Sequence, residues 1–403
     1  MNARRPAPLR GIRVLDLTSV VLGPYCTQIL ADLGADVVKI EGPEGDTTRN
    51  VGPARERGMT GTFLNLNRNK RGVCLDLKRP EAVQALLRLV RGADVFMHSM
   101  RPQAVAKLGI GWTVLRAANP RLVYCNAWGF GSSGPYAEKA AYDDIIQAAA
   151  GLVDLTEMAT GRASYAPTVV GDKVTGLTLL YAALAALLER AVTGRGQEVE
   201  VPMFETLASF VLAEHMSGAV FEPPLSPPVY GRQVSRERRP FDTADGRLSV
   251  IVYTDKQWLA FGEIVGEPGV LSLPRFGTLA ERNANIDAVN RWLAERLRTR
   301  TTDEWLRLLD AAGVPAMKVL ATADLAGDPH LQAVGFFETR EDATLGRLHY
   351  PGSPARFDGA APTVRSRAPR LGEHNREVLA EAGFSAAEID ALVACRALVQ
   401  EAA

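Results

Sequence analysis

One carboxylate in this sequence stands where it could act as a nucleophile. Asp172 lies in PTVVGDKVTGLTLL, between a strand-like apolar run and the start of an apolar helix. Gly171 lets the backbone there approach another group closely. Asp172 either caps the helix or, kept ionised at neutral pH by the helix N-terminus, attacks an acyl group to form a covalent intermediate. Asp143 and Asp144, in AYDDIIQAAAG, show a weaker version of the same pattern.

Basic side chains in the first domain could hold a phosphorylated cofactor. They form either a solvated surface or a pocket wall that binds phosphate through charge-assisted hydrogen bonds. NAD(P) is not the expected cofactor. GFGSSG at 129–134 matches the dinucleotide fingerprint in letters, but Pro135 and a polar stretch follow it where that fingerprint requires a helix. The basic group comprises NRNKR at 67–71, Lys78, Arg101 and Lys107.

Other common kinds of site lack their residues. The four cysteines and five histidines are scattered, with no CxxC or HExxH spacing, which argues against a disulfide scaffold and a metal site. No GxSxG motif supports a serine hydrolase. We therefore expect a protein with no metal and no tightly bound cofactor.

Charge and composition exclude further classes of partner. The 403 residues carry 46 Lys plus Arg and 46 Asp plus Glu, so no basic excess favours nucleic acid or an anionic membrane. The apolar run 174–188 is short for a bilayer and is typical of a buried helix. No apolar stretch follows the charged N-terminus, as a secretory signal would require. We expect a cytoplasmic protein.

The elements that would position Asp172 follow an α/β pattern. Short apolar runs at 13–18, 36–41, 72–77, 94–99 and 122–129 are typical of strands, and helical stretches at 23–33 and from Pro80 lie between them. Repeated strand–helix–strand units predict a parallel sheet covered by helices on both faces. A long helical region is predicted from Asp144 to Glu189.

The pattern changes beyond residue 220. Five prolines between 221 and 240 exclude a helix or central strand and indicate a linker. We predict strands at 247–252 and in PAMKVL, helices near 286–298 and 303–312, a hairpin at 336–350, and C-terminal helices near 374–382 and 385–393.

Several segments, in order and spacing, resemble the class III CoA-transferases (CaiB/BaiF), the family of formyl-CoA:oxalate transferase and carnitine CoA-transferase. The resemblance runs from about Leu9 to Asn375. The segments that carry it are LRGIRVLDLTSVVLGPYCTQILADLGADVVKIEGPEGD, FLNLNRNKRGVCLDLK, GFGSSGPY, AYDDIIQAAAGL, VVGDKVTGLTLLYAALAALLERAVTGRGQEVEVPMFE, RRPFDTADG, GVPAMKVL, DPHLQAVGFF and APRLGEHN.

The resemblance implies a Rossmann-like large domain with a parallel sheet, an inserted smaller α+β domain, and an interlocked homodimer. The large domain would span 1–220, followed by the linker at 221–240 and the small domain at 241–320. Residues 321–403 would return to the large domain and close with the C-terminal helices.

The resemblance also implies that Asp172 is the catalytic nucleophile. CoA would pass from an acyl-CoA thioester to a carboxylic acid through an aspartyl anhydride and an aspartyl-CoA thioester. CoA would be a substrate, and backbone N–H groups would stabilise the developing oxyanions. The CoA contacts implied by resemblance are Val20, Leu75, Lys78, Ser99, Met100, Lys107 and Leu108, with Tyr142 near the thioester arm.

Two departures from the oxalate enzyme concern the acid substrate. Val21 replaces a glutamine, and the glycine run of the small domain is missing; both argue against oxalate and formate. Arg238 and Arg239, with Arg232 and Arg236, crowd the linker instead. We hypothesise that they either form a solvated basic segment or bind the second carboxylate of a dicarboxylic acid such as succinate, making succinyl-CoA or another dicarboxylyl-CoA the donor.

Two alternative functions stay open. The related α-methylacyl-CoA racemases pair the aspartate with a histidine, but Tyr142 stands at that place, and a phenol with a pKa near 10 is a poor partner for proton exchange at neutral pH. The chain could also be a non-catalytic CoA-binding subunit of a heteromer, against which the retained GD motif argues.

Overall fold

The computed structural model describes residues 7–399. They form two compact units. The first holds the described residues up to 150, residues 167–210 and those from 329 onward; the second holds 151–166 and 211–328. The chain thus changes unit near 151, 167, 211 and 329, whereas we placed the large domain at 1–220, the linker at 221–240 and the return segment at 321. The division into domains stays a prediction.

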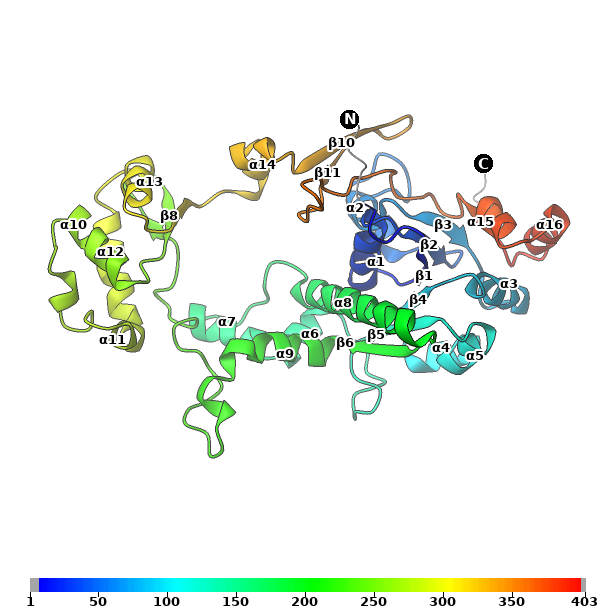
Figure 1. The fold of residues 1–403 in the computed structure, drawn as a ribbon, viewed down its shortest axis with the longest axis horizontal. Helices are drawn as coiled ribbons and strands as arrows, with labels where there is room; N and C mark the ends of the chain where they lie inside the picture. The colour runs from blue at the N-terminus through cyan, green and yellow to red at the C-terminus, as the bar shows by residue number, and fades with distance from the viewer. Residues whose placement is uncertain (1–6, 400–403) are drawn as a thin grey trace. The chain divides into compact units, whose positions relative to one another are not determined.

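Six parallel strands form the main sheet of the first unit, in the order β3-β2-β1-β4-β5-β6 (Figure 1). The predicted α/β class with a parallel sheet is confirmed. This order reverses between β1 and β4, and such a switch point leaves a crevice beyond the carboxyl ends of the two strands. The strands are β1 (Arg13–Leu17), β2 (Asp36–Glu41), β3 (Arg71–Cys74), β4 (Val95–His98), β5 (Val123–Trp128) and β6 (Glu198–Pro202).

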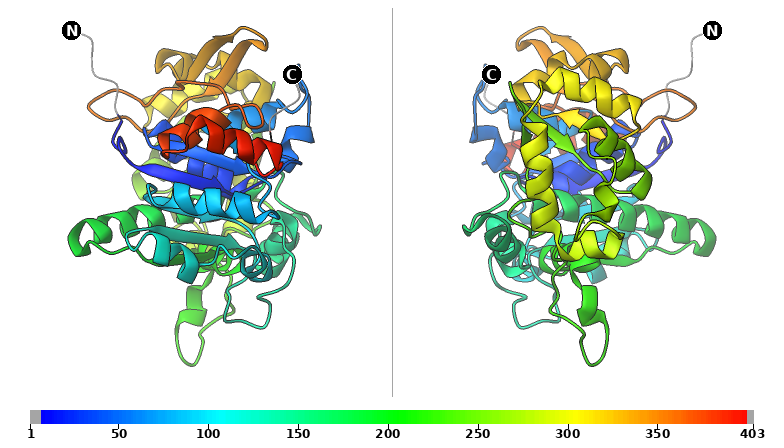
Figure 2. Two further views of the ribbon diagram at one scale, coloured as in Figure 1. Left: turned by 90° about the vertical axis from the view of Figure 1, so that its right-hand side faces the viewer. Right: turned by 90° about the vertical axis from the view of Figure 1, so that its left-hand side faces the viewer.

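Alternation along the strands divides the core into two layers. On one face, Leu15 and Leu17 of β1 belong to a cluster completed by five helices, two of them from the C-terminal segment. In Figures 1 and 2 these two helices, drawn in red, lie against the sheet. The five are α3 (Pro80–Val90), α4 (Pro102–Leu108), α5 (Trp112–Ala118), α15 (Asn375–Glu381) and α16 (Ala386–Ala394).

Helices α1 (Leu22–Asp32) and α8 (Val170–Thr193) pack closely together in the first unit. Gly176 permits this approach, since a Cβ at that position would lie 2.6 Å from the carbonyl oxygen of Leu22. The first unit also contains the predicted hairpin, which is confirmed, and shorter elements. These are η1 (Thr47–Asn50), α2 (Gly61–Asn67), α6 (Asp143–Ala149), α14 (Pro329–Ala333), β10 (Phe337–Asp342) and β11 (Gly346–Pro351).

The single helical region predicted from Asp144 to Glu189 is wrong, because the chain there forms three helices. Gly151 and Gly161 adopt φ values of 82° and 78°, in the left-handed region where a right-handed helix stops. Helix α7 (Leu152–Thr160) lies between them, and α8 begins only after an irregular segment. The seven-residue helices α2, α4 and α5 were not predicted, since such short segments carry little hydrophobic periodicity.

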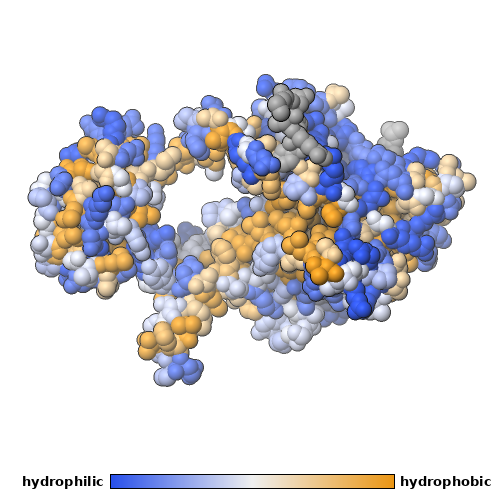
Figure 3. Space-filling view, in the orientation of Figure 1, coloured by the Kyte–Doolittle hydropathy of each residue, from blue (hydrophilic) through white to orange (hydrophobic). Residues whose placement is uncertain are grey.

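Helix α8 is less buried than its apolar sequence predicts. Tyr181 and Leu188 are 64% and 72% exposed, and Leu177 and Val192 are also exposed. Figure 3 shows apolar side chains gathered over this helix. By length and composition alone α8 could cross a membrane, a weak criterion that core helices of soluble proteins also meet. As described, the helix leaves an apolar face uncovered.

The second unit packs helices against a small antiparallel sheet (Figure 2). Trp258, Phe261 and Trp305 are fully buried at its centre. Capping boxes begin three helices, at Thr254, Thr278 and Thr301. Its elements, besides α7, are η2 (Ser217–Val220), β7 (Phe241–Asp242), β8 (Arg247–Val250), α10 (Asp255–Ile264), η3 (Val270–Ser272), α11 (Leu279–Ala284), α12 (Ile286–Leu297), α13 (Thr302–Ala311), β9 (Ala316–Lys318) and η4 (Thr322–Gly327), while α9 (Met203–His215) spans the change of unit.

Candidate functional site

Asp172 lies in the first turn of α8 without capping it. The cap position belongs to Val169, so the capping interpretation of Asp172 is wrong. The backbone N–H of Asp172 donates a hydrogen bond to Oδ1 of Asp143, at 2.9 Å. Gly171 lies against the same oxygen, since a Cβ added there would be 3.1 Å from it. The Gly171–Asp172 pair thus places the backbone of α8 in contact with the buried carboxylate of Asp143.

The environment of Asp172 makes its carboxylate unusually basic. Burial, followed by the nearby charge of Asp143, raises the pKa of Asp172 to about 7. We expected the helix N-terminus to keep this carboxylate fully ionised at neutral pH; instead it titrates near neutrality, because burial and Asp143 outweigh the helix terminus. A carboxylate that binds protons more tightly is also a stronger nucleophile once ionised.

The turn after β1 is strained where it approaches the predicted CoA site. Val20 has φ of 67°, a conformation that is rare for a β-branched residue and costs on the order of 1–3 kcal/mol. Its N–H donates to Oδ1 of Asp46, at 3.2 Å. The ammonium group of Lys39 holds the other oxygen of Asp46, at 2.9 Å, and the same Nζ donates to the carbonyl of Thr18. The buried Lys39–Asp46 ion pair therefore holds the strained turn in place through hydrogen bonds to its backbone.

A cavity of about 220 Å³ opens at the switch point of the sheet. It is lined on one side by Thr18 and Ser19, which follow β1, and on another by Met100, which follows β4. The N–H of Ser19 donates to Oγ of Ser99, at 3.3 Å, and so joins the two strand ends. Four predicted CoA contacts line this cavity: Leu75, Lys78, Met100 and Leu108.

The remaining predicted contacts do not line this cavity. Val20 and Ser99 lie at its edge, bonded to the lining residues Asp46 and Ser19. Lys107 is exposed in the last turn of α4. Tyr142 occupies the N-cap position of α6, without a capping hydrogen bond from its side chain, and is 71% exposed. Val21 occupies the N-cap position of α1. Their roles in binding stay predictions.

Sequence reasoning missed the loop that closes this cavity. Residues 42–46, GPEGD, follow β2 and contribute five lining positions. The carboxylate of Glu44 lies 3.7 Å from the ammonium group of Lys78, and both are exposed. A Gly- and Pro-rich turn directly after a buried strand was the available signal.

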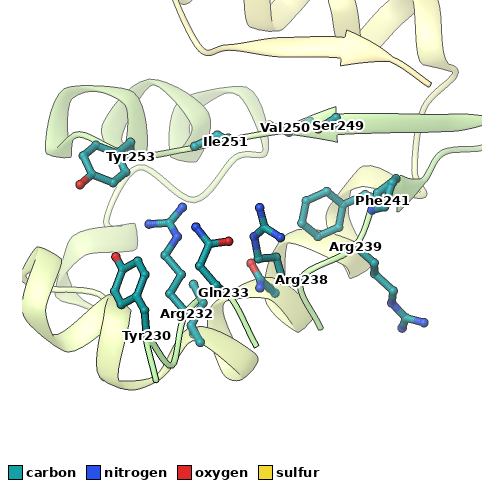
Figure 4. A pocket seen from close by; sticks show the side chains of 13 residues that line it. Tyr230, Arg232, Gln233, Arg238, Arg239, Phe241, Ser249, Val250, Ile251 and Tyr253 are labelled. Carbon is teal, nitrogen blue, oxygen red and sulfur yellow. The ribbon is translucent and has the colours of Figure 1, made fainter. Parts of the chain in front are cut away.

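The predicted substrate arginines lie in the second unit. Arg238 and Arg239 line a cavity of about 430 Å³ together with Arg232 (Figure 4). Arg236 is not part of that lining. Among residues 7–399, no group of three His, Cys, Asp or Glu side chains is placed to hold a metal ion. The predicted absence of a metal stays a prediction.

The family model named CoA-transferase family III matches residues 9–375. The chain belongs to this family. As a class III CoA-transferase of the CaiB/BaiF type, it belongs to a family of enzymes whose substrates are CoA thioesters. The matched range includes the GD motif, the strained turn and the residues of the switch-point cavity, all of which lie in the first unit.

Curated relatives of this CoA-transferase cover nearly its whole length. A succinate–glutarate CoA-transferase from Agrobacterium fabrum is 32% identical, over 94% of this chain and 97% of the relative. The β subunit of a succinyl-CoA–L-malate CoA-transferase from Chloroflexus aurantiacus is 33% identical, over 93% and 94%. The crystal structure of Rv3272 from Mycobacterium tuberculosis matches with a TM-score of 0.80 at 30% identity, covering 93% of this chain and all of that one.

Replacing the basic carboxylate should stabilise the protein in a pH-dependent way. The folded-state pKa of Asp172, about 7, exceeds its ordinary value of 3.8, so the protonated form stabilises the fold at low pH and this contribution is lost as pH rises between these values. Asp172→Asn should therefore raise the melting temperature by about a few degrees at pH 8 and by less at pH 5, as measured by calorimetry. Equal shifts at both pH values, or a decrease at pH 8, would contradict this pKa.

Proposed function

We propose that this CoA-transferase moves CoA between dicarboxylic acids, with succinyl-CoA or another dicarboxylyl-CoA as the donor and Asp172 as the nucleophile. The basic, half-buried carboxylate of Asp172 carries the proposal. Relatives named for succinate, glutarate and malate support the class of acid.

The proposed reaction at Asp172 has two symmetrical halves, the first of which transfers CoA from the donor to the aspartate. Its carboxylate attacks the donor thioester carbon, the C–S bond breaks, and CoA leaves as thiolate, giving a mixed anhydride. The thiolate then attacks the aspartyl carbon of the anhydride, which releases the donor acid as carboxylate and leaves an aspartyl-CoA thioester. No proton, metal or electron carrier enters these steps.

The second half reverses the first with a new acid. The acceptor carboxylate attacks the aspartyl thioester, and thiolate leaves again. Thiolate then attacks the acceptor carbonyl of the second anhydride, and Asp172 returns as a free carboxylate. Asp143 is a positioning residue in this scheme: its Oδ1 accepts from the N–H of Asp172, and its charge keeps the neighbouring carboxylate basic.

We also propose that the working form is a homodimer in which a second copy covers the exposed face of α8. The apolar side chains on that face support this, because monomeric proteins rarely leave a large contiguous apolar patch in water. The resemblance to class III CoA-transferases implies the same state.

Trapping should detect the covalent intermediate. With succinyl-CoA and hydroxylamine present, the peptide containing Asp172 should gain a hydroxamate in mass spectrometry. Asp172→Asn should give no hydroxamate and lower transfer by about 10⁴-fold or more. CoA esters formed from a panel of glutarate, malate, butyrate and a long-chain fatty acid would identify the acceptor class. Exchange of the α-proton of a branched acyl-CoA without any transfer would favour a racemase instead.

The acid limb of the pH–rate profile should report Asp172. Transfer should rise with pH around a midpoint near 7, since only the ionised carboxylate attacks. Asp143→Asn retains an oxygen to accept the N–H of Asp172 but removes the negative charge, so the midpoint should move to lower pH. Asp144→Asn is the matched control, because Asp144 is exposed on the same helix. An unchanged midpoint in Asp143→Asn would contradict the coupling.

Disrupting the face of α8 should prevent newly folded subunits from assembling. Tyr181→Asp combined with Leu188→Asp places two charges on the exposed face, and light scattering should then measure the mass of a monomer where the unaltered protein gives a dimer. Thr113→Asp, at an exposed position of α5, should leave the mass unchanged. A monomeric unaltered protein, or a double variant that stays dimeric, would argue against the proposed interface.

A further inference from the structure

The larger cavity has the composition of a binding site for an anion. It lies wholly in the second unit, between the segment 230–241 and the strand β8 with its extension to Tyr253. In Figure 4 the side chains of Arg232, Gln233 and Arg238 point from that segment toward the strand, whereas Arg239 points away from them. Arg239 lies 3.4 Å from the carboxylate of Glu237.

Two guanidinium groups in this cavity have no counter-ion. Among the residues that the structure describes, no Asp or Glu lines the cavity, and neither Arg232 nor Arg238 forms an ion pair. Arg232 has only a long hydrogen bond to Asn283, at 3.5 Å, and stacks 5.3 Å from the centre of the Tyr253 ring. A guanidinium held this way is oriented and still free to donate to an oxyanion.

A recess of about 30 Å³ shares several of its walls with this cavity, Arg232 and Tyr253 among them, and adds further donors. Trp258 and Arg282 line it, and both are buried. Within the described part of the chain, Nε1 of Trp258 and Nε of Arg282 have no acceptor. Buried donors without an acceptor are uncommon in native proteins, and both of these belong to residues that line the recess.

Apolar walls favour a particular oxyanion. Phe241, Val250, Ile251 and Ile286 line the cavity beside the arginines. A short methylene chain ending in carboxylate groups matches both surfaces, since the chain contacts apolar walls while a carboxylate accepts two parallel hydrogen bonds from one guanidinium. Inorganic phosphate or a CoA phosphate offers the same oxygen chemistry without a chain.

We propose that this cavity binds small dicarboxylic acids through Arg232 and Arg238 and makes the enzyme prefer them to monocarboxylic acids. The inference rests on the proposed function and assigns its substrate class to a site in the second unit. It gives these roles to Arg232 and Arg238 and none to Arg239, whose guanidinium is turned toward Glu237.

Direct binding tests this site without relying on transfer. Ligand-observed NMR titration should show glutarate binding to the whole protein, with butyrate binding more weakly. Arg232→Gln combined with Arg238→Gln should weaken glutarate binding by about tenfold or more, weaken butyrate binding by a smaller factor, and leave CoA binding unchanged. Arg247→Gln is the control, because Arg247 is an equally charged, exposed residue of β8 outside the lining.

Several outcomes would overturn the inference. These are no glutarate binding by the unaltered protein, equal binding by the double variant, or an equal loss of CoA affinity, which would identify a phosphate site. Arg238→Gln alone, at an exposed position, tests the site if the double variant unfolds.

In transfer assays with the double variant, the KM for dicarboxylates should rise while kcat stays unchanged. Trapping at Asp172 should persist in the double variant, so its absence from the unaltered protein would contradict the proposed mechanism and leave the binding result standing.

Discussion

The fold of the first unit depends on two buried lysines, each paired with a buried carboxylate. Lys70 lies 3.0 Å from Asp16 of β1, and Lys39 of β2 lies 2.9 Å from Asp46, with all four side chains fully buried. Burial by itself would raise the pKa of Asp16, but Lys70 and Lys39, together with hydrogen bonds from Thr18 and Thr27, lower that pKa to about 2. Removing either partner would leave a buried charge uncompensated, so the strands, α1 and the loops must keep their places together.

This ionic cluster connects the fold to the chemistry. Asp16 accepts from Thr27 of α1, and the Lys39–Asp46 pair holds the strained turn at Val20. That turn begins α1, against which Gly176 lets α8 pack. Because α8 carries Asp172 in its first turn, the proposed nucleophile and the switch-point cavity are positioned by one continuous set of buried contacts.

The two units differ in how they present charge. In the first unit, basic side chains near the sheet, such as Lys70 and Lys39, form ion pairs with buried carboxylates. In the second, Arg232 and Arg238 keep their hydrogen-bonding capacity beside a cavity free of lining acids. A net charge of zero for the whole chain conceals this contrast, and the proposed binding of a dicarboxylic acid depends on the local distribution of charge.

Much of this protein followed from sequence alone, because strand alternation, Gly and Pro signals and a family-specific order of motifs are local properties. The parallel sheet, the hairpin and Asp172 as the residue of interest were identified this way. Tertiary structure decided the rest: the break of one predicted helix into three, the exposed face of α8, the cavity loop at 42–46 and the raised pKa of Asp172. Burial and the proximity of Asp143, 29 positions away in sequence, set that pKa. Neither can be read from the sequence, because the residues involved are neighbours only in the fold.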